Sequence, residues 1–210
     1  MKTVKLKSLI DFPNFRQTFY YDCGASAMHS VMAYYGMDIS EKDMIRLVET
    51  HGKTGTSFFG LINVAKKVGL KYKCYWSGLT ISDLKRYIDK KIPVVLQIQA
   101  WPEKREKDLK KSWTDGHFVV AMGYDNKRIY FNDPSTILIA YLTYRELEER
   151  WHDIDFYKGS QRKVSNAGIV FFGKKPLFKN KNAMHMDYDA YDSSKIHEDI
   201  FKIERYIKIK

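Results

Sequence analysis

One cysteine in this chain occupies a position that favours its reactive form. Cys23 follows Asp22, a residue type that caps helices by accepting backbone N–H bonds through its carboxylate, and precedes the small residues Gly24–Ala27. An apolar stripe at helical spacing then leads to Gly36, a typical helix end. We therefore predict a helix that begins at Cys23. The partial positive charge at its N-terminus favours the thiolate, the nucleophilic form of cysteine.

The alternative for Cys23 is a small buried side chain, which is the usual situation of a free cysteine. The other cysteine, Cys74, fits that description because it lies on the apolar phase of a predicted strand. A nucleophile needs a base within hydrogen-bond reach, and the base needs a group that orients it. Cys23 can therefore act as a nucleophile only if other parts of the chain place a base and an orienting group beside it.

His117 is the histidine best placed to be that base. It begins a predicted strand that turns at 125–127 into a second arm at 128–131, so Asp133 falls at the same end of the hairpin as His117. A carboxylate there can hold the imidazole in the required tautomer. A surface histidine beside a turn aspartate is an equally simple interpretation of these two residues alone. The remaining histidines are predicted to be structural, exposed or without a rigid frame: His29, His51, His152, His185 and His197.

Gln17 supplies a fourth polar group, six residues before Cys23. If the lead-in folds back over the helix tip, the Gln17 side-chain amide and the Cys23 backbone N–H can both donate to an oxyanion. Without the other three residues, a glutamine in an ordinary loop is the better interpretation.

The elements that must position these residues change in type along the chain. Cap signals at Ser40, Thr56-Ser57, Thr80 and Thr143 predict four further helices. The charged stretch 101–115 is predicted to be a mobile flap or loop. Alternating or apolar runs predict strands at Leu70–Trp76, Ile92–Ile98, His117–Tyr124, Arg128–Phe131, Ile137–Leu142 and Ala167–Gly173. Helices followed by hairpin-linked strands indicate the α+β class, with N-terminal helices packed on an antiparallel sheet.

The 210 residues suit one domain with an appendage. We place the domain at residues 1–173 and a linker with a C-terminal helical extension at 174–210, where the composition becomes rich in lysine and asparagine. The terminal helix is expected to begin at Ser193 or Ser194, and its isoleucines recur along one face: Ile196, Ile200, Ile203 and Ile207.

Composition excludes several classes of protein. The N-terminus lacks the apolar core of a signal peptide, and no run approaches the ~20 apolar residues of a membrane helix. Two cysteines make no disulfide framework, so we expect a cytoplasmic protein, and neither has metal-ligand spacing, so we expect no metal or other cofactor. The net charge of +11 comes from scattered lysines and arginines, so a lysine-rich surface explains it better than a nucleic-acid partner.

Taken in order, five segments resemble the papain-like cysteine peptidases, and more closely the bacteriocin-processing peptidases that cut leader peptides after a double glycine. The segments are Gln17, Asp22-Cys23-Gly24-Ala25, Tyr34-Tyr35-Gly36, Gly116–Val120 and Asp133-Pro134. Within residues 11–173, the resemblance implies a papain-like fold, a Cys23–His117–Asp133 triad and an oxyanion hole that includes Gln17. Bacteriocin-processing members are usually fused to an exporter and an ATPase domain. Neither is found in this sequence, so a double-glycine leader is not implied as the substrate.

The expected function is therefore that of a cysteine peptidase acting on a peptide or protein through a thioester intermediate. Two other classes of function stay open at this stage. An acyltransferase or amidase can use the same scaffold and the same thioester. A non-catalytic module that binds peptides or an anionic partner needs no reactive thiol.

Overall fold

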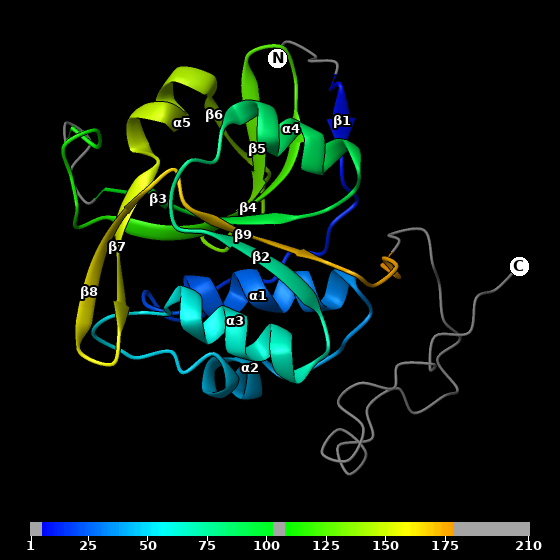
Figure 1. Cartoon of the computed structure of the whole chain (residues 1–210), viewed down its shortest axis with the longest axis vertical. Helices are drawn as coiled ribbons and strands as arrows, with labels where there is room; N and C mark the ends of the chain where they lie inside the picture. The colour runs from blue at the N-terminus through cyan, green and yellow to red at the C-terminus, as the bar shows by residue number, and fades with distance from the viewer. Residues whose placement is uncertain (1–5, 103–107, 179–210) are drawn as a thin grey trace, which may run out of the picture.

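The computed structural model describes residues 6–102 and 108–178. Five helices and nine strands follow one another along this part of the chain (Figure 1). Their bounds are β1 Ser8–Leu9, α1 Cys23–Tyr34, α2 Glu41–Leu47, α3 Phe58–Lys67, β2 Lys71–Tyr75, α4 Ile81–Asp89, β3 Val94–Gln99, β4 Gly116–Tyr124, β5 Arg128–Asn132, β6 Ala140–Thr143, α5 Tyr144–Arg150, β7 His152–Tyr157, β8 Ser160–Ser165 and β9 Gly168–Phe172.

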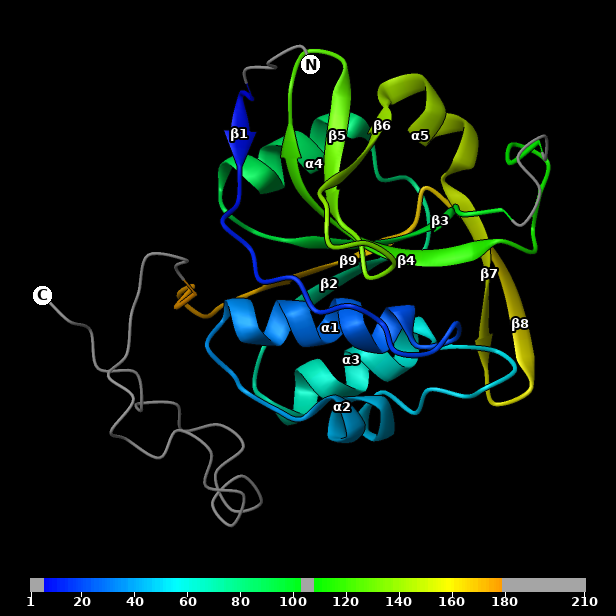
Figure 2. The ribbon, with the colours of Figure 1, turned by 180° about the vertical axis from the view of Figure 1, so that it is seen from behind.

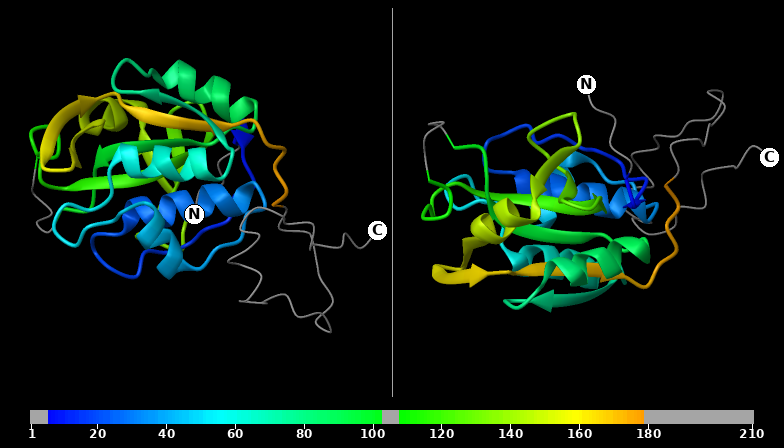
Figure 3. Two further views of the ribbon diagram at one scale, coloured as in Figure 1. Left: turned by 60° about the horizontal axis from the view of Figure 1, so that its bottom comes forward. Right: turned by 90° about the horizontal axis from the view of Figure 1, so that it is seen from above.

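A seven-stranded antiparallel sheet forms the centre of the molecule. Its strands follow the order β2-β9-β3-β4-β5-β6, with the short β1 also paired to β4, while β7 and β8 form a separate hairpin. Helices α1, α2 and α3 cover one face of the sheet, and α4 and α5 lie on the other (Figures 1 and 3). This arrangement confirms the predicted α+β class with its N-terminal helices on an antiparallel sheet.

Helix α1 is the most deeply buried helix of the fold, with eleven of its twelve residues buried. A side chain at Gly24 would place its Cβ 2.6 Å from Cβ of Thr56 and 2.9 Å from Cδ2 of Phe118. The small residues that open the helix therefore let its tip lie against β4 and against the loop before α3. As predicted, the helix begins at Cys23 and stops ahead of Gly36, whose φ of +78° suits glycine.

Side-chain caps fix the starts of the other four helices, as the sequence predicts. Ser40, Ser57, Thr80 and Thr143 each accept a hydrogen bond from the backbone N–H three residues later. At α4 and α5 the capping box is complete, because Asp83 and Glu146 return a bond to the cap backbone. Each such cap stabilises the fold by about 1 kcal/mol.

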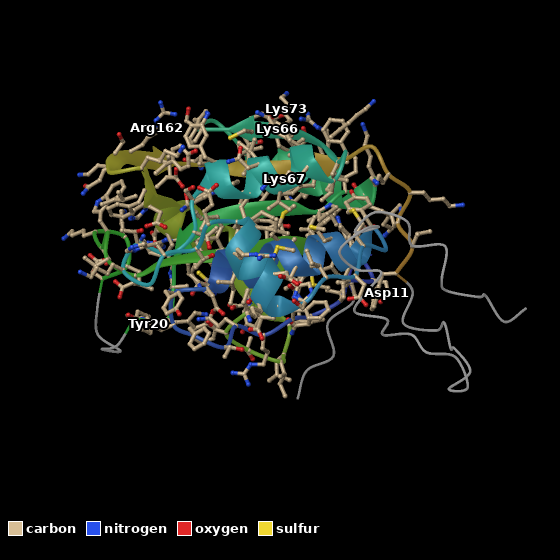
Figure 4. The ribbon with its side chains drawn as sticks, turned by 90° about the horizontal axis from the view of Figure 1, so that it is seen from below. Asp11, Tyr20, Lys66, Lys67, Lys73 and Arg162 are labelled. Carbon is tan, nitrogen blue, oxygen red and sulfur yellow. The ribbon has the colours of Figure 1, made fainter. Side chains whose placement is uncertain are left out.

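The open edge of the sheet at β2 is lined with lysines. Lys71 and Lys73 are exposed on this strand, and Lys66 and Lys67 at the end of α3 lie on the same side of the molecule (Figure 4). Charged side chains on an edge strand discourage pairing with another chain, and lysines at a helix C-terminus complement its dipole. These four lysines therefore have a structural explanation.

The prediction of a strand at Ile137–Leu142 is only partly correct. Strand β6 begins at Ala140, opposite Phe131 of β5. The three apolar residues before it are left in a loop with exposed fractions of 73%, 70% and 51% for Ile137, Leu138 and Ile139. A turn after Asp133 reverses the chain, so these residues form the connection and cannot pair.

The hairpin of β7 and β8 is absent from the predicted elements. Its inward positions carry carboxylates, Asp153 and Asp155, instead of the apolar residues that the period-two pattern requires. The turn at Lys158-Gly159 has positive φ at both residues, +48° and +79°. The prediction that His152 has no rigid frame is wrong, because it is buried and its Nε2 lies 2.8 Å from the carbonyl oxygen of Ser112.

Residues 174–178 continue past the sheet and contact the end of α1. The backbone N–H groups of Leu177 and Phe178 both donate to the carbonyl oxygen of Tyr34. The terminal helix predicted after Ser193 lies outside the described residues. Within 6–102 and 108–178, no helix is long and apolar enough to cross a membrane.

We predict that Gly24→Ala destabilises the protein by about 1–3 kcal/mol, because the added methyl group overpacks the contact with Thr56 and Phe118. Urea unfolding measures the effect. Gly52→Ala is the matched control, since the nearest atom to its new Cβ lies 3.8 Å away, and a change within about 0.5 kcal/mol is expected. Equal losses in the two variants contradict the packing argument.

Candidate active site

His117 and Asp133 form a buried pair at one end of the β4–β5 hairpin. The imidazole Nε2 lies 2.8 Å from Oδ1 of Asp133, and the residues are 6% and 3% exposed. The hairpin turns at 125–127 as predicted, so the first residues of β4 and the residues after β5 meet at the same end. The sequence-based pairing of His117 with Asp133 is thus present in the structure.

Cys23 lies close to the same imidazole. The tip of α1 packs on β4, and the Cys23 side chain interacts with His117. Burial by itself lowers the pKa of His117, but the interactions with Asp133 and Cys23 outweigh it and raise the pKa to about 10. With Nε2 turned to Asp133, Nδ1 is left for the thiol.

Asp133 is held by more than His117. The Ser135 N–H donates to Oδ1 at 2.8 Å, and the Trp101 indole N–H donates to Oδ2 at 2.9 Å. Burial alone raises the pKa of Asp133, yet the bonds from His117, Ser135 and Trp101 bring it below the ordinary value. The carboxylate therefore stays ionised and fixed in orientation.

Sequence reasoning missed Trp101, which was assigned only to a loop. Its backbone φ is +55°, an uncommon value for a residue other than glycine, and this turns the indole toward Asp133 while the residue stays 58% exposed. A tryptophan followed by Pro102 at the end of a strand carries no pattern that points to a partner 32 residues later. Only the fold brings the two together.

Asp22 does not cap α1 as predicted. The residue stands at the N-cap position, but its carboxylate makes no bond to the helix. It accepts instead the backbone N–H groups of Thr18, at 3.3 Å, and Phe19, at 3.2 Å. The fully buried carboxylate thus ties the lead-in loop to the helix tip, and no side-chain cap from Asp22 occupies the N–H groups beside Cys23.

Gln17 lies where that loop meets the Asp133 turn. Its backbone N–H donates to Pro134 O at 2.9 Å, and its Oε1 accepts the Ser135 hydroxyl at 3.1 Å. Its Nε2 donates to Phe19 O at 2.9 Å. Figure 2 shows the segment 10–22 running along α1 toward the start of that helix. All four site residues singled out from the sequence therefore meet in one region.

The remaining candidates lie elsewhere. Burial raises the pKa of Cys74 to about 12, so this thiol is unreactive at neutral pH. His29 is buried, with its ring stacked 3.8 Å from Phe15. In the part of the chain that the structure describes, no three histidine, cysteine or acidic side chains gather as they would around a metal ion.

Three helices on an antiparallel sheet, with a cysteine at a helix tip against a histidine–aspartate pair, are the features of the papain-like cysteine peptidases. More specifically, the chain belongs to the Peptidase_C39 like family, whose model matches residues 9–158. This is a family of cysteine peptidases, and therefore of hydrolases. The family suggested by the sequence motifs is thus confirmed.

Solved structures share this fold at low sequence identity. A C39-like peptidase from Bacillus anthracis has a TM-score of 0.59 at 15% identity, with 80% of this chain and 98% of that chain covered. The peptidase domain of Streptococcus ComA has a TM-score of 0.54 at 21% identity, over 78% and 96%. A double-glycine-motif protease from an AMS/PCAT transporter, solved with its leader peptide, has a TM-score of 0.54 at 18% identity, over 79% and 94%.

A curated relative is much longer than the matched region. The transport/processing ATP-binding protein ComA of Streptococcus pneumoniae is 26% identical over 137 residues, which are 65% of this chain and 17% of ComA. The chain therefore corresponds to a small part of that protein.

We predict that Asp133→Asn lowers the pKa of His117 by about 1–3 pH units, because burial then outweighs the remaining interaction with Cys23. An NMR titration of the imidazole C–H protons measures the pKa. His29, buried elsewhere on α1, is the internal control and should titrate as in the wild type. An unchanged His117 titration contradicts the assigned role of the Asp133 charge.

Proposed function

We propose that this protein hydrolyses peptide bonds with Cys23 as the nucleophile, His117 as general base and acid, and Asp133 as the residue that orients the imidazole. The observation that carries the proposal is the position of His117, which is hydrogen-bonded to Asp133 at 2.8 Å and interacts with Cys23. An imidazole with a pKa of about 10 keeps its proton at neutral pH, which favours a thiolate–imidazolium pair.

The reaction follows from these positions. His117 takes the proton of Cys23, and the thiolate sulfur attacks the carbonyl carbon of the scissile bond to give a tetrahedral oxyanion. Its collapse breaks the C–N bond as His117 protonates the leaving amine, so a thioester remains on Cys23. A water molecule, deprotonated by His117, attacks the thioester; the acid product leaves and the thiol is regenerated.

Gln17 and the backbone N–H of Cys23 form the proposed oxyanion hole. One Gln17 amide N–H is bonded to Phe19 O, which leaves the second N–H for an oxyanion. The Cys23 N–H belongs to a helix start that the Asp22 side chain does not cap. Donors fixed in this way stabilise negative charge as it develops, without reorganising during the reaction.

The proposed substrate is a peptide or protein segment. A groove of about 490 Å³ borders the site at Asp133 and Trp101, and its wall includes Leu138, Ile139 and Tyr141. Such a groove suits apolar side chains near the scissile bond. We place the peptidase unit at residues 1–173, with 174–210 as an extension. Because the mechanism needs the free Cys23 thiol, we expect the protein to act in a reducing compartment such as the cytoplasm.

Digestion of a peptide library, analysed by mass spectrometry, tests the proposal. We expect the wild type to cleave and Cys23→Ala to lose turnover, whereas Cys74→Ala, the matched control, should cleave at the wild-type rate. Cleavage products also define the specificity. The proposal is wrong if Cys23→Ala cleaves as fast as the wild type, or if Cys23 is alkylated by iodoacetamide no faster than Cys74 at neutral pH.

We predict that Gln17→Ala reduces kcat by about a hundred- to a thousandfold with little change in KM, because an oxyanion donor acts mainly in the transition state. Steady-state kinetics on a peptide identified in the library measure both constants. Gln161→Ala, an exposed glutamine on β8, should behave as the wild type. A loss confined to KM assigns Gln17 to ground-state binding and removes it from the oxyanion hole.

A further inference from the structure

A second carboxyl group lies directly beneath the start of β4. Asp153, on β7, is 7% exposed, and both of its carboxyl oxygens would lie 2.4 Å from a Cβ at position 116. Only glycine leaves room for the carboxyl group there. Gly116 is the residue immediately before His117, so the carboxyl packs on the backbone that carries the imidazole, and its charge interacts with His117.

Gln99 holds this carboxyl group in position by hydrogen bonding. Its Nε2 donates both to Oδ1 of Asp153 and to the carbonyl oxygen of His152, each at 3.0 Å, while its Oε1 accepts the Asp115 N–H at 2.9 Å. Gln99 is fully buried and lies opposite Gly116 in the register of β3 and β4. One amide side chain on β3 therefore bonds both β7 and Asp115, the residue just before β4.

Burial of this carboxyl group in its charged form destabilises the folded protein. Among the described residues, no lysine or arginine forms an ion pair with Asp153, and the carboxylate of Asp155 lies on the same strand. Burial raises the pKa of Asp153 to about 7, and the Asp155 charge adds to the effect. An asparagine could make the Gln99 bond without that cost. Packing alone thus does not explain an acid at this position.

We propose that Asp153 is a positioning residue that acts through His117: its carboxyl fixes Gly116–His117, and its negative charge supports the imidazolium of the thiolate–imidazolium pair. The inference rests on the proposed function. The groups that face Asp153 are Gln99 from β3, His117 from β4, and Asp155 and the neighbouring His152 from β7. His117 is the group in this set whose protonated form the proposed chemistry uses.

The charge that Asp153 supplies depends on pH, whereas a purely structural role of this side chain would not. With a pKa raised to about 7, Asp153 changes gradually from a neutral acid to an anion beside His117 as the pH rises through this value. Its contribution to the reactivity of Cys23 should therefore appear as the pH rises through about 7. Stability should instead fall as the pH rises from about 4 to about 7, because in that range the folded protein keeps a proton on Asp153 that the unfolded chain has already lost.

The test uses Asp153→Asn, which keeps the shape and the bond from Gln99. Alkylation of Cys23 by iodoacetamide is followed by mass spectrometry at about pH 5.5 and about pH 8. We expect equal rates in variant and wild type at the lower pH and a rate about three- to tenfold lower in the variant at the higher pH. The melting temperature of the variant at about pH 8 should be equal to or above that of the wild type.

Asp125→Asn is the matched control. Asp125 is also buried, but it lies past the other end of β4, where it accepts the Lys127 and Arg128 N–H groups. Its variant should give the same rate ratio to wild type at both pH values. An equal loss at both pH values for Asp153→Asn assigns the residue a structural role only, and no loss at either overturns the proposal.

Two further measurements keep the test decisive. If Asp153→Asn does not fold, the wild-type alkylation profile replaces it, and absence of an inflection near pH 7 overturns the proposal. Peptide cleavage is measured on the same samples. A pH-dependent alkylation ratio without any Cys23-dependent cleavage refutes the peptidase assignment and leaves the role of Asp153 intact.

Discussion

The candidate site depends on the surroundings of one buried imidazole. Burial lowers the pKa of His117, and its interactions with Asp133 and Cys23 raise it to about 10. Asp133 meets Nε2 directly, Cys23 lies close to the imidazole, and Asp153 lies behind the preceding residue. Each of these groups comes from a different element, so the sheet, the tip of α1 and the β7–β8 hairpin must all be in place before the site exists.

Hydrogen bonds of both side chains and backbone join the segments around the site. Asp22 holds the lead-in loop, and Gln17 bonds that loop to Pro134 and Ser135. Movement of the loop would therefore disturb both the proposed oxyanion donor and the turn that carries Asp133. Close packing explains why α1 begins with small residues. A larger side chain at Gly24 would collide with Thr56 and Phe118 and separate the thiol from β4.

The β7–β8 hairpin gives this fold polar support under its site. Asp155 bonds the first N–H of α3, and Asp153 bonds Gln99 at the end of β3. These carboxyl groups face the interior of the fold, where backbone and amide donors bond them but burial still raises the pKa of both. Family membership and the shared fold account for the arrangement of the core. The proposed role of Asp153 concerns the position and the charge environment of the His117 imidazole.

The sequence by itself determined whatever rests on local rules: the start of α1 at Cys23, the four capped helices, the hairpin turn at 125–127 and hence the meeting of His117 with Asp133. Tertiary structure alone decided which partner a buried polar group takes. The Asp22 carboxylate bonds a loop, Trp101 bonds Asp133, and Asp153 and Asp155 face inward on an unpredicted hairpin. Hydrophobic periodicity carries no information about such partners, because they are fixed by burial and by groups distant in the chain.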